Sequence, residues 1–241
     1  MPTTTLGLIG AGHIGGTVAR LAVDAGLDVV LSNCRGPDTL TGLVSELGPH
    51  ARAATGTEAA RAAEIVVVSV PLGVYRTLPA EALAGKIVID ANNYYPDRDG
   101  HIAGLDAGTV TSSTLVQQHL SASQVVKAFN NIAYVHLAQL ARATGATDRS
   151  ALPIAGDDPA PKAEVTALLD TLGYDAVDAG TLADSWRSQP GTPVYVNPYM
   201  PVPPAEPPAD QAAWFLAAPG TPAPTARIRE LLDAATRAGT R

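Results

Sequence analysis

The sequence contains little sulfur, few aromatic side chains and few charges. Its single cysteine, Cys34, excludes an internal disulfide and a cysteine-based metal cluster. Aromatic residues make up 5% and charged residues 16% of the 241 residues, whereas apolar ones make up 46%. Apolar runs never reach the roughly 18 residues of a membrane span, and the N-terminus lacks a basic region followed by a long apolar one. We therefore expect a soluble, cytoplasmic, globular protein without a membrane partner.

Basic residues are also scarce. The chain has 16 lysines and arginines against 23 aspartates and glutamates, which gives a formal net charge of −7. This balance argues against a general nucleic-acid-binding protein, because a phosphate backbone requires a basic surface. The length fits one large domain, or one domain with an appendage.

A glycine-rich turn between a strand-like and a helix-like segment stands at the start of the chain. The apolar run 6–9 leads into Gly10, Gly12 and Gly15, and apolar residues then recur at helical spacing. This spacing is typical of dinucleotide-binding domains. Gly10 permits the turn, Gly12 lets the backbone approach a pyrophosphate, and Gly15 lets the helix lie close to the strand. The alternative is a glycine-rich turn that binds no ligand.

Strand-like and helix-like segments alternate as far as residue 180. Apolar runs predict strands at 27–32, 52–54, 65–70, 86–90, 124–129, 152–156 and 174–178. Helical spacing predicts helices at 39–47, 57–63, 115–120, 133–143 and 162–172, with Thr57 as the N-cap of the second. This alternation predicts an α/β fold with a Rossmann-type, doubly wound, mostly parallel sheet.

The composition changes after residue 180. Eleven of the 20 prolines lie within 190–224, a density that excludes the interior of a regular sheet. Large apolar side chains lie among them, namely Tyr195, Tyr199, Met200, Trp214 and Phe215. We therefore expect a dinucleotide-binding Rossmann domain over 1–180 and a small, ordered, proline-rich C-terminal extension over 181–241. This cap should end in a helix over about 225–238.

The end of the second predicted strand indicates which dinucleotide is bound. NAD-specific domains usually place an acidic residue there to bind the ribose 2′-hydroxyl. Here the residues are Ser32, Asn33, Cys34 and Arg35, with no acid. A guanidinium can bind a 2′-phosphate through two hydrogen bonds. The sequence therefore favours NADP(H), with Arg35 as its main ligand and Asn33 assisting, unless Arg35 is an ordinary loop arginine.

Three further segments should follow strands at the ligand crevice, and they read SVP (69–71), DANN (90–93) and KAFNN (127–131). Their asparagines either tie loops or bind a carboxamide. His13 lies in the glycine turn, where contact with the cofactor or with solvent is favoured over acid–base chemistry. His119 and His136 are expected to be structural or exposed. Because no catalytic triad, metal-ligand spacing or carboxylate pair stands out, the pattern fits hydride transfer, in which the cofactor carries the chemistry. No catalytic side chain and no metal is assigned.

Several segments together resemble the coenzyme-F420-dependent NADP oxidoreductases. They are LIGAGHIG (8–15), SNCRGP (32–37), SVP (69–71), DANN (90–93) and VKAFNN (126–131). The segments DAG (178–180), SWR (185–187) and PGTP (190–193) resemble the actinobacterial branch of that family. The resemblance runs in order over about residues 5 to 200.

This resemblance implies a homodimeric enzyme in which hydride passes directly between NADP(H) and the deazaflavin F420. The implied NADP(H) ligands are Gly10, His13, Ile14, Asn33, Arg35, Ser69, Val70 and Pro71, with Asn92 and Asn130 near the crevice where the rings stack. Gly12, Gly15 and the backbone N–H of Cys34 complete the expected cofactor site. Cys34 departs from the serine usual in the family, and a thiol is a poorer hydrogen-bond donor than a hydroxyl.

Two other functions remain open. One is an NADPH-dependent reductase of a small imine or carbonyl compound, whose proton donor would be Tyr94, Tyr95 or His13. The other is a non-enzymatic NADP(H)-sensing protein that binds a partner through its proline-rich segment. For a second substrate, Trp186 and Arg187 offer an apolar wall and a cation. The alternative is that they pack on the domain and that Arg187 pairs with an acid such as Asp184.

Overall fold

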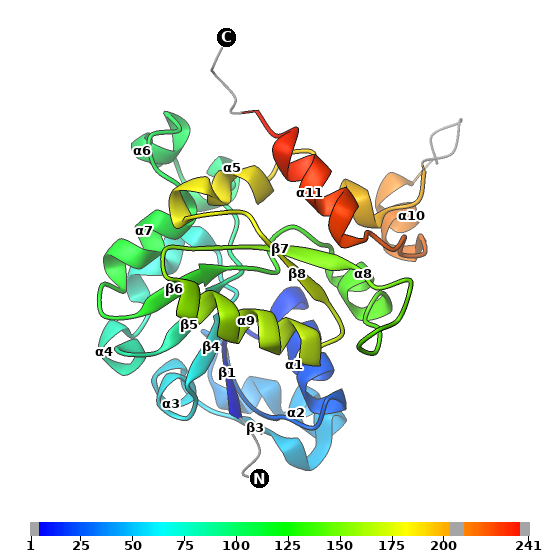
Figure 1. Cartoon of the computed structure of the whole chain (residues 1–241). Helices are drawn as coiled ribbons and strands as arrows, with labels where there is room; N and C mark the ends of the chain where they lie inside the picture. Colours follow the sequence, from blue (N-terminus) through cyan, green and yellow to red (C-terminus); the bar gives the residue numbers. More distant parts are fainter. Residues whose placement is uncertain (1–4, 203–209, 237–241) are drawn as a thin grey trace.

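A single sheet forms the centre of the molecule (Figure 1). In the computed structural model, which describes residues 5–202 and 210–236, it has eight strands in the order β3-β2-β1-β4-β5-β6-β7-β8. The strands are β1 (Thr5–Ile9), β2 (Asp28–Ser32), β3 (Ala51–Ala53), β4 (Ile65–Val68), β5 (Ile87–Asp90), β6 (Gln124–Lys127), β7 (Ala151–Gly156) and β8 (Asp175–Asp178). All neighbours pair in parallel except β6 and β7. The predicted Rossmann-type, doubly wound, mostly parallel sheet is confirmed.

Helices cover both faces of the sheet because successive strand residues point to opposite sides. Val67 belongs to a core shared with α1 (His13–Asp24), α2 (Thr41–Leu47), α8 (Tyr134–Gln139) and α9 (Pro159–Thr171). Its neighbours Val66 and Val68 pack with α3 (Gly56–Arg61), α4 (Ala80–Leu83), α7 (Ser112–His119) and the 3-10 helix Leu72–Thr77. Figure 1 shows α3, α4 and α7 on one side of the sheet and α1, α2 and α8 on the other.

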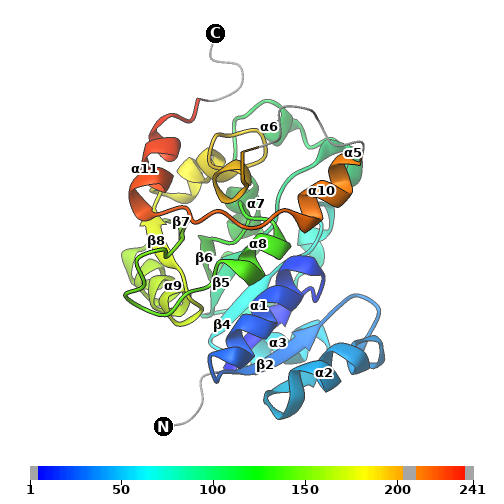
Figure 2. The ribbon, with the colours of Figure 1, turned by 90° about the vertical axis from the view of Figure 1, so that its right-hand side faces the viewer.

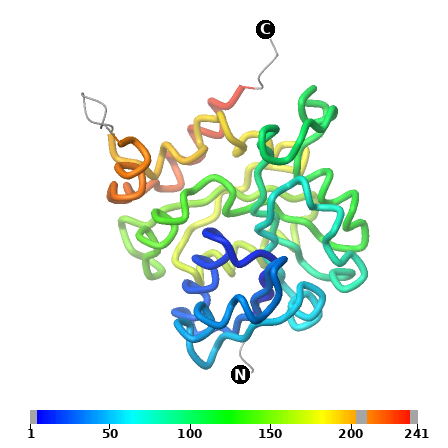
Figure 3. Tube along the Cα trace, turned by 180° about the vertical axis from the view of Figure 1, so that it is seen from behind, coloured from blue at the N-terminus to red at the C-terminus, as the bar shows by residue number. Residues whose placement is uncertain are grey.

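The chain after β8 lies beyond the carboxyl end of β1, as the view from behind shows (Figure 3). The 3-10 helix Leu182–Ser188 packs against α7, and α11 (Thr225–Asp233) packs on β7 and β8. In the sequence, α10 (Gln211–Ala217) comes between these two helices. The predicted cap is ordered over its described part, while 203–209 and 237–241 lie outside the described residues. No helix of the described chain is long and apolar enough to cross a membrane.

Several local predictions need correction. The helix expected over 133–143 is only α8, and the N-cap of α3 is Thr55, not Thr57. Thr55 accepts a hydrogen bond from the Glu58 N–H, and the Glu58 carboxylate accepts one from the Thr55 N–H, which is a capping box. The helices α4, α5 (Pro96–Asp99), α6 (Ala103–Asp106) and α10 were not expected. Segments of four to seven residues contain too few turns for helical periodicity to show.

Candidate functional site

The carboxyl ends of five strands form a row along one edge of the sheet. Strand register places Ser32 beside Ile9, Ile9 beside Val68, Val68 beside Asp90, and Asp90 beside Lys127. The turns that follow these residues therefore meet at the same edge. The structure thus brings together the predicted cofactor residues of the glycine turn, of 33–35, of 69–71, and of the loops after β5 and β6.

The three glycines of the turn play different parts. Gly10 has a φ of +102°, and a Cβ there would lie 2.1 Å from the carbonyl oxygen of Ser69. A Cβ on Gly15 would lie 1.9 Å from the carbonyl oxygen of Gly10. In contrast, a Cβ on Gly12 would have no atom of the described protein within 4 Å, apart from those of Gly12 and its two chain neighbours. The fold itself therefore requires Gly10 and Gly15, whereas the space at Gly12 is open to a ligand.

The N-terminus of α1 completes this cradle. Gly12 is the N-cap, no side chain caps the helix, and its first turn has no acidic residue. The N–H groups of that turn and the helix dipole are thus available to an anion. This arrangement fits the pyrophosphate of a dinucleotide.

At the end of β2, Asn33 shapes the loop and Arg35 extends from it. The Asn33 Oδ1 accepts a hydrogen bond of 3.0 Å from the Arg35 N–H, and its Nδ2 donates one of 2.9 Å to the Thr39 hydroxyl. Cys34 and Arg35 are exposed. Within 5–202 and 210–236, the Arg35 guanidinium has no protein partner. The expected cation is therefore available, while the Asn33 side chain is largely engaged by its own loop.

Asn92 connects the ends of β4 and β5. Its Oδ1 accepts a hydrogen bond of 2.8 Å from the Val70 N–H, and its own N–H donates to the Asp90 carboxylate over 3.0 Å. The residue is only 2% exposed. Asn92 therefore lies at the expected crevice, and its side chain holds the turn at 69–71.

Asn130 ties loops, which was one of the two alternatives for the asparagines. Its Nδ2 donates to Asn93 Oδ1 over 3.2 Å and to the Ser188 carbonyl over 2.8 Å, and the side chain is buried. Asn93 in turn donates to the Asn130 carbonyl over 2.7 Å. The prediction that Asn130 binds the cofactor is not supported, because its amide is already engaged by the protein.

The candidate proton donors occupy different surroundings. The His13 ring stacks on Tyr134 with a centroid distance of 4.2 Å and an angle of 18°. Both residues line a groove of about 830 Å³ between α1, α2 and α8. Figure 2 shows α1 and α8 side by side.

Tyr94 is committed to the loop that follows it. Its hydroxyl donates to Asp106 over 2.6 Å and accepts from the Ile102 N–H over 3.0 Å. Partial burial and the hydrogen bond to Asp106 raise the pKa of Tyr94. Tyr95 and Tyr195 instead share a hydrogen bond between their hydroxyl groups. Burial and that bond raise the pKa of Tyr195.

Two further histidines are structural, as expected. His119 Nε2 lies 3.0 Å from the Leu78 carbonyl oxygen. His136 is fully buried, and its Nε2 lies 3.1 Å from the carbonyl oxygen of Ala218, just after α10. This contact attaches α8 to the C-terminal part of the chain.

Arg187 does not lie at the crevice. Its Nη1 donates a hydrogen bond of 3.0 Å to the carbonyl of Leu232, in the last turn of α11, and its guanidinium lies 5.0 Å from the centre of the Trp186 ring. Because α11 packs on β7 and β8, this contact places Arg187 near the β8 edge of the sheet, whereas the glycine turn follows β1, five strands away from β8. The predicted roles of Trp186 and Arg187 at the second-substrate site are therefore not supported. The contact with the Leu232 carbonyl favours the structural alternative.

A buried ion pair at the strand ends was not predicted. Lys127 is 2% and Asp90 0% exposed, and the Lys127 ammonium lies 3.2 Å from the Asp90 carboxylate. Burial lowers the pKa of Lys127, and the carboxylate partly opposes this shift. The available signal was that two apolar strand-like runs carry Asp90 and Lys127, which have opposite charges; that these strands are neighbours emerges only from the structure. Among the described residues, no cluster of His, Cys, Asp or Glu is placed to hold a metal.

The fold and the edge of strand ends define a Rossmann-type dinucleotide-binding protein. A family model described as NADP oxidoreductase, coenzyme F420-dependent, matches residues 5–94. These residues run from β1 through the loop that contains Asn92. The chain belongs to this family of NADP-dependent oxidoreductases, which confirms the resemblance seen in the sequence.

Solved structures extend the similarity beyond residues 5–94. The hypothetical protein SMa0349 from Sinorhizobium meliloti is 30% identical, covers 80% of this chain and 93% of its own, and superposes with a TM-score of 0.69. A protein from Arthrobacter sp. FB24, described as a candidate F420-dependent NADP-reductase, is 28% identical over 76% of this chain and 87% of its own, with a TM-score of 0.64.

More distant matches are partial. The Escherichia coli K12 protein YjhV is 43% identical over 51 residues, which are 21% of this chain and 37% of that protein. The chain thus spans little more than a third of that relative. A reductive aminase from Aspergillus terreus in complex with NADPH and ethyl levulinate is 20% identical over 76% of this chain and 57% of its own, with a TM-score of 0.53. That likeness concerns the fold alone.

Proposed function

We propose that this oxidoreductase transfers a hydride between NADP(H) and the deazaflavin coenzyme F420. NADP(H), when bound, supplies or accepts the hydride at its nicotinamide. The open space at Gly12 and the uncapped first turn of α1 would receive the pyrophosphate. Arg35 would bind the 2′-phosphate, and the turn at 69–71 would lie beside the nicotinamide.

The observation that carries the proposal is the state of the ionisable side chains at the ends of β5 and β6. Lys127 is buried against Asp90, and the Tyr94 hydroxyl is engaged by Asp106 and Ile102. Neither is placed to donate a proton to a substrate. Transfer between two aligned rings depends on their positions rather than on such a donor. The similarity to the Arthrobacter protein supports F420 as the acceptor.

A specific observation favours a second candidate, the reduction of a small imine or carbonyl compound. The paired hydroxyls of Tyr95 and Tyr195 join the loop after β5 to the C-terminal cap, and Tyr95 is 36% exposed. A tyrosine in this place can donate a proton to a reduced imine or carbonyl. Deazaflavin reduction by the rings alone should be insensitive to Tyr95→Phe, whereas this alternative requires the hydroxyl.

Stopped-flow mixing tests the proposal. The protein is mixed with NADPH and oxidised F420, and the loss of deazaflavin absorbance is recorded. We expect NADPH-dependent reduction that is absent in Gly12→Val and retained in Tyr95→Phe. Reduction of imines or ketones but not of F420, lost in Tyr95→Phe, would establish the second candidate. Tight NADPH binding without turnover of any acceptor would instead point to a sensing protein.

A further inference from the structure

A chain of buried polar contacts runs behind the turn at 69–71. Ser113 donates a hydrogen bond of 2.7 Å to the Asp90 carboxylate, and the Lys127 ammonium lies 3.2 Å from the same oxygen. Lys127 also donates to the Asn92 carbonyl. Asn92 in turn accepts from the Val70 N–H. The contacts thus lead from α7 through the ends of β6 and β5 to the turn that follows β4.

Stability alone gives no reason for an ion pair at this place. Two charges lose their hydration when they are buried, and apolar side chains of similar volume are often as stabilising. The strand positions on either side of the pair are apolar, with Val68 beside Asp90 and Ala155 beside Lys127 in the register. Because apolar side chains could replace the pair without loss of stability, its presence is better explained by the groups that it holds in place.

The pair holds Asn92 at both backbone groups. Its N–H donates to Asp90 over 3.0 Å, and its carbonyl accepts from Lys127. The Asn92 side chain is thereby directed so that Oδ1 meets the Val70 N–H. Its Nδ2 is buried and has no partner among the described residues, so the amide leaves one hydrogen bond unmade. Asn92 thus remains in this position although one of its hydrogen bonds is unmade. This indicates that the hydrogen bond between its Oδ1 and the Val70 N–H has a function.

We infer that Asp90 and Lys127 are positioning residues that fix the turn at 69–71 against the nicotinamide half of the cofactor. This inference rests on the proposed binding of NADP(H), and it assigns the pair no contact with the cofactor itself. Without the pair, Asn92 loses both backbone anchors, and the turn can move relative to the cradle at Gly12. Displacements of about 1 Å around a reacting ring can change rates by about 100-fold.

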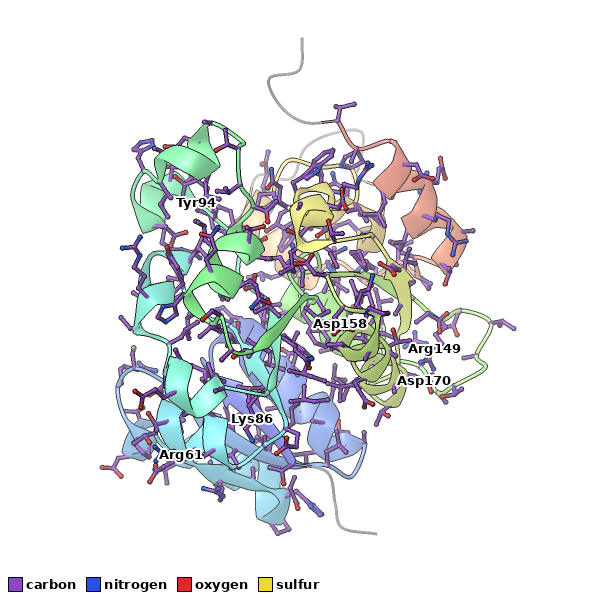
Figure 4. All side chains as sticks on the ribbon, turned by 60° about the vertical axis from the view of Figure 1, so that its left-hand side comes forward. Arg61, Lys86, Tyr94, Arg149, Asp158 and Asp170 are labelled. Atoms are coloured by element: carbon purple, nitrogen blue, oxygen red, sulfur yellow. The ribbon has the colours of Figure 1, made fainter. Side chains whose placement is uncertain are left out.

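The test compares two ligands that share one half. NADPH has the nicotinamide, whereas 2′,5′-ADP has only the adenosine, 2′-phosphate and 5′-phosphate. Because Lys127→Met alone would leave a buried, unpaired carboxylate, and Asp90→Asn would keep an oxygen that accepts the Asn92 N–H, the principal variant is Lys127→Met with Asp90→Leu. Lys86→Met is the matched control, because it also removes a lysine that is paired with an acid, in this case Glu64. Lys86 precedes the amino end of β5, whereas Asp90 is at its carboxyl end (Figure 4).

We expect the double variant to bind 2′,5′-ADP as the wild type does. Its dissociation constant for NADPH should rise about tenfold, or the anisotropy of nicotinamide emission at saturation should fall, because the ring is no longer held. Lys86→Met should show neither change. Equal weakening of both ligands, or a lower melting temperature with both NADPH signals unchanged, would make the pair merely structural and overturn the inference. Failure of the wild type to bind either ligand would instead refute the proposed function, and neither readout depends on the second substrate.

Discussion

Arg35→Ala is the most direct test of the cofactor assignment. The guanidinium is exposed and has no protein partner within the described residues, so its removal should leave the melting temperature unchanged. Hydrogen bonds to a charged group contribute about 1.5–3 kcal/mol. Since about 1.4 kcal/mol corresponds to a factor of ten, the dissociation constant for NADPH should rise about 10- to 150-fold. The constant for NADH, which lacks the 2′-phosphate, should scarcely change.

Titration calorimetry with both cofactors measures these constants on the same preparation. Arg61→Ala is a suitable control because it removes an exposed arginine from the end of α3, on the opposite side of the sheet from α1 (Figure 4). It corrects for the change in net charge. If Arg35→Ala weakened NADPH and NADH equally, or Arg61→Ala produced the same loss, Arg35 would not be the 2′-phosphate ligand.

Three further predictions concern single substitutions. Gly12→Val should abolish NADPH binding, because the valine side chain would occupy the open space at the glycine turn that the pyrophosphate needs. The circular dichroism spectrum should remain that of the wild type. Normal NADPH binding would show that the turn holds no phosphate. Arg187→Ala should leave the affinity for NADPH unchanged but remove the hydrogen bond to α11. The free energy of unfolding should fall by about 1.5 kcal/mol, and the melting temperature by about 3–6 °C. Loss of turnover at an unchanged melting temperature would contradict this prediction. Burial alone would raise the pKa of Asp99, but Arg98 and the N–H groups of Tyr95 and Gly73 bring it below its ordinary value. A lowered folded-state pKa contributes stability that is present above the unfolded pKa of about 3.9 and is lost as the pH falls through the folded value. Melting curves of wild type and Asp99→Asn between pH 2 and 6 should therefore converge toward the acid end, and a constant difference would refute the linkage.

The sequence was sufficient for the fold and for the sheet edge at which the site lies. Apolar strand runs such as 65–70 and the glycine spacing are local patterns with a direct physical cause. The direction of β7 was not predictable, because a buried strand has the same apolar composition whether it runs parallel or antiparallel. The loop over 142–149, which replaces the end of a predicted helix, likewise depends on contacts with distant residues such as Asp170 and Tyr174.

Individual site residues were predictable where their role depends on local sequence, and not where it depends on distant partners. Gly10 and Gly15 were predictable because their need for a missing Cβ arises within one turn. Asn130 and Arg187 were not, because the partners that occupy them are 58 and 45 residues away. The ion pair of Asp90 and Lys127 required knowledge of which strands are neighbours. Sequence patterns therefore located the cradle, while tertiary contacts decided which polar side chains remain available to a ligand.

The contacts of Asn130, Asn131 and His136 have a consequence for the boundary at residue 180. Asn130 donates to the carbonyl of Ser188, Asn131 to that of Val194, and His136 Nε2 lies against that of Ala218. All three side chains are buried. A protein truncated after residue 180 would expose an apolar face and leave these polar groups without their partners. We therefore predict that the segments before and after residue 180 unfold in one cooperative transition.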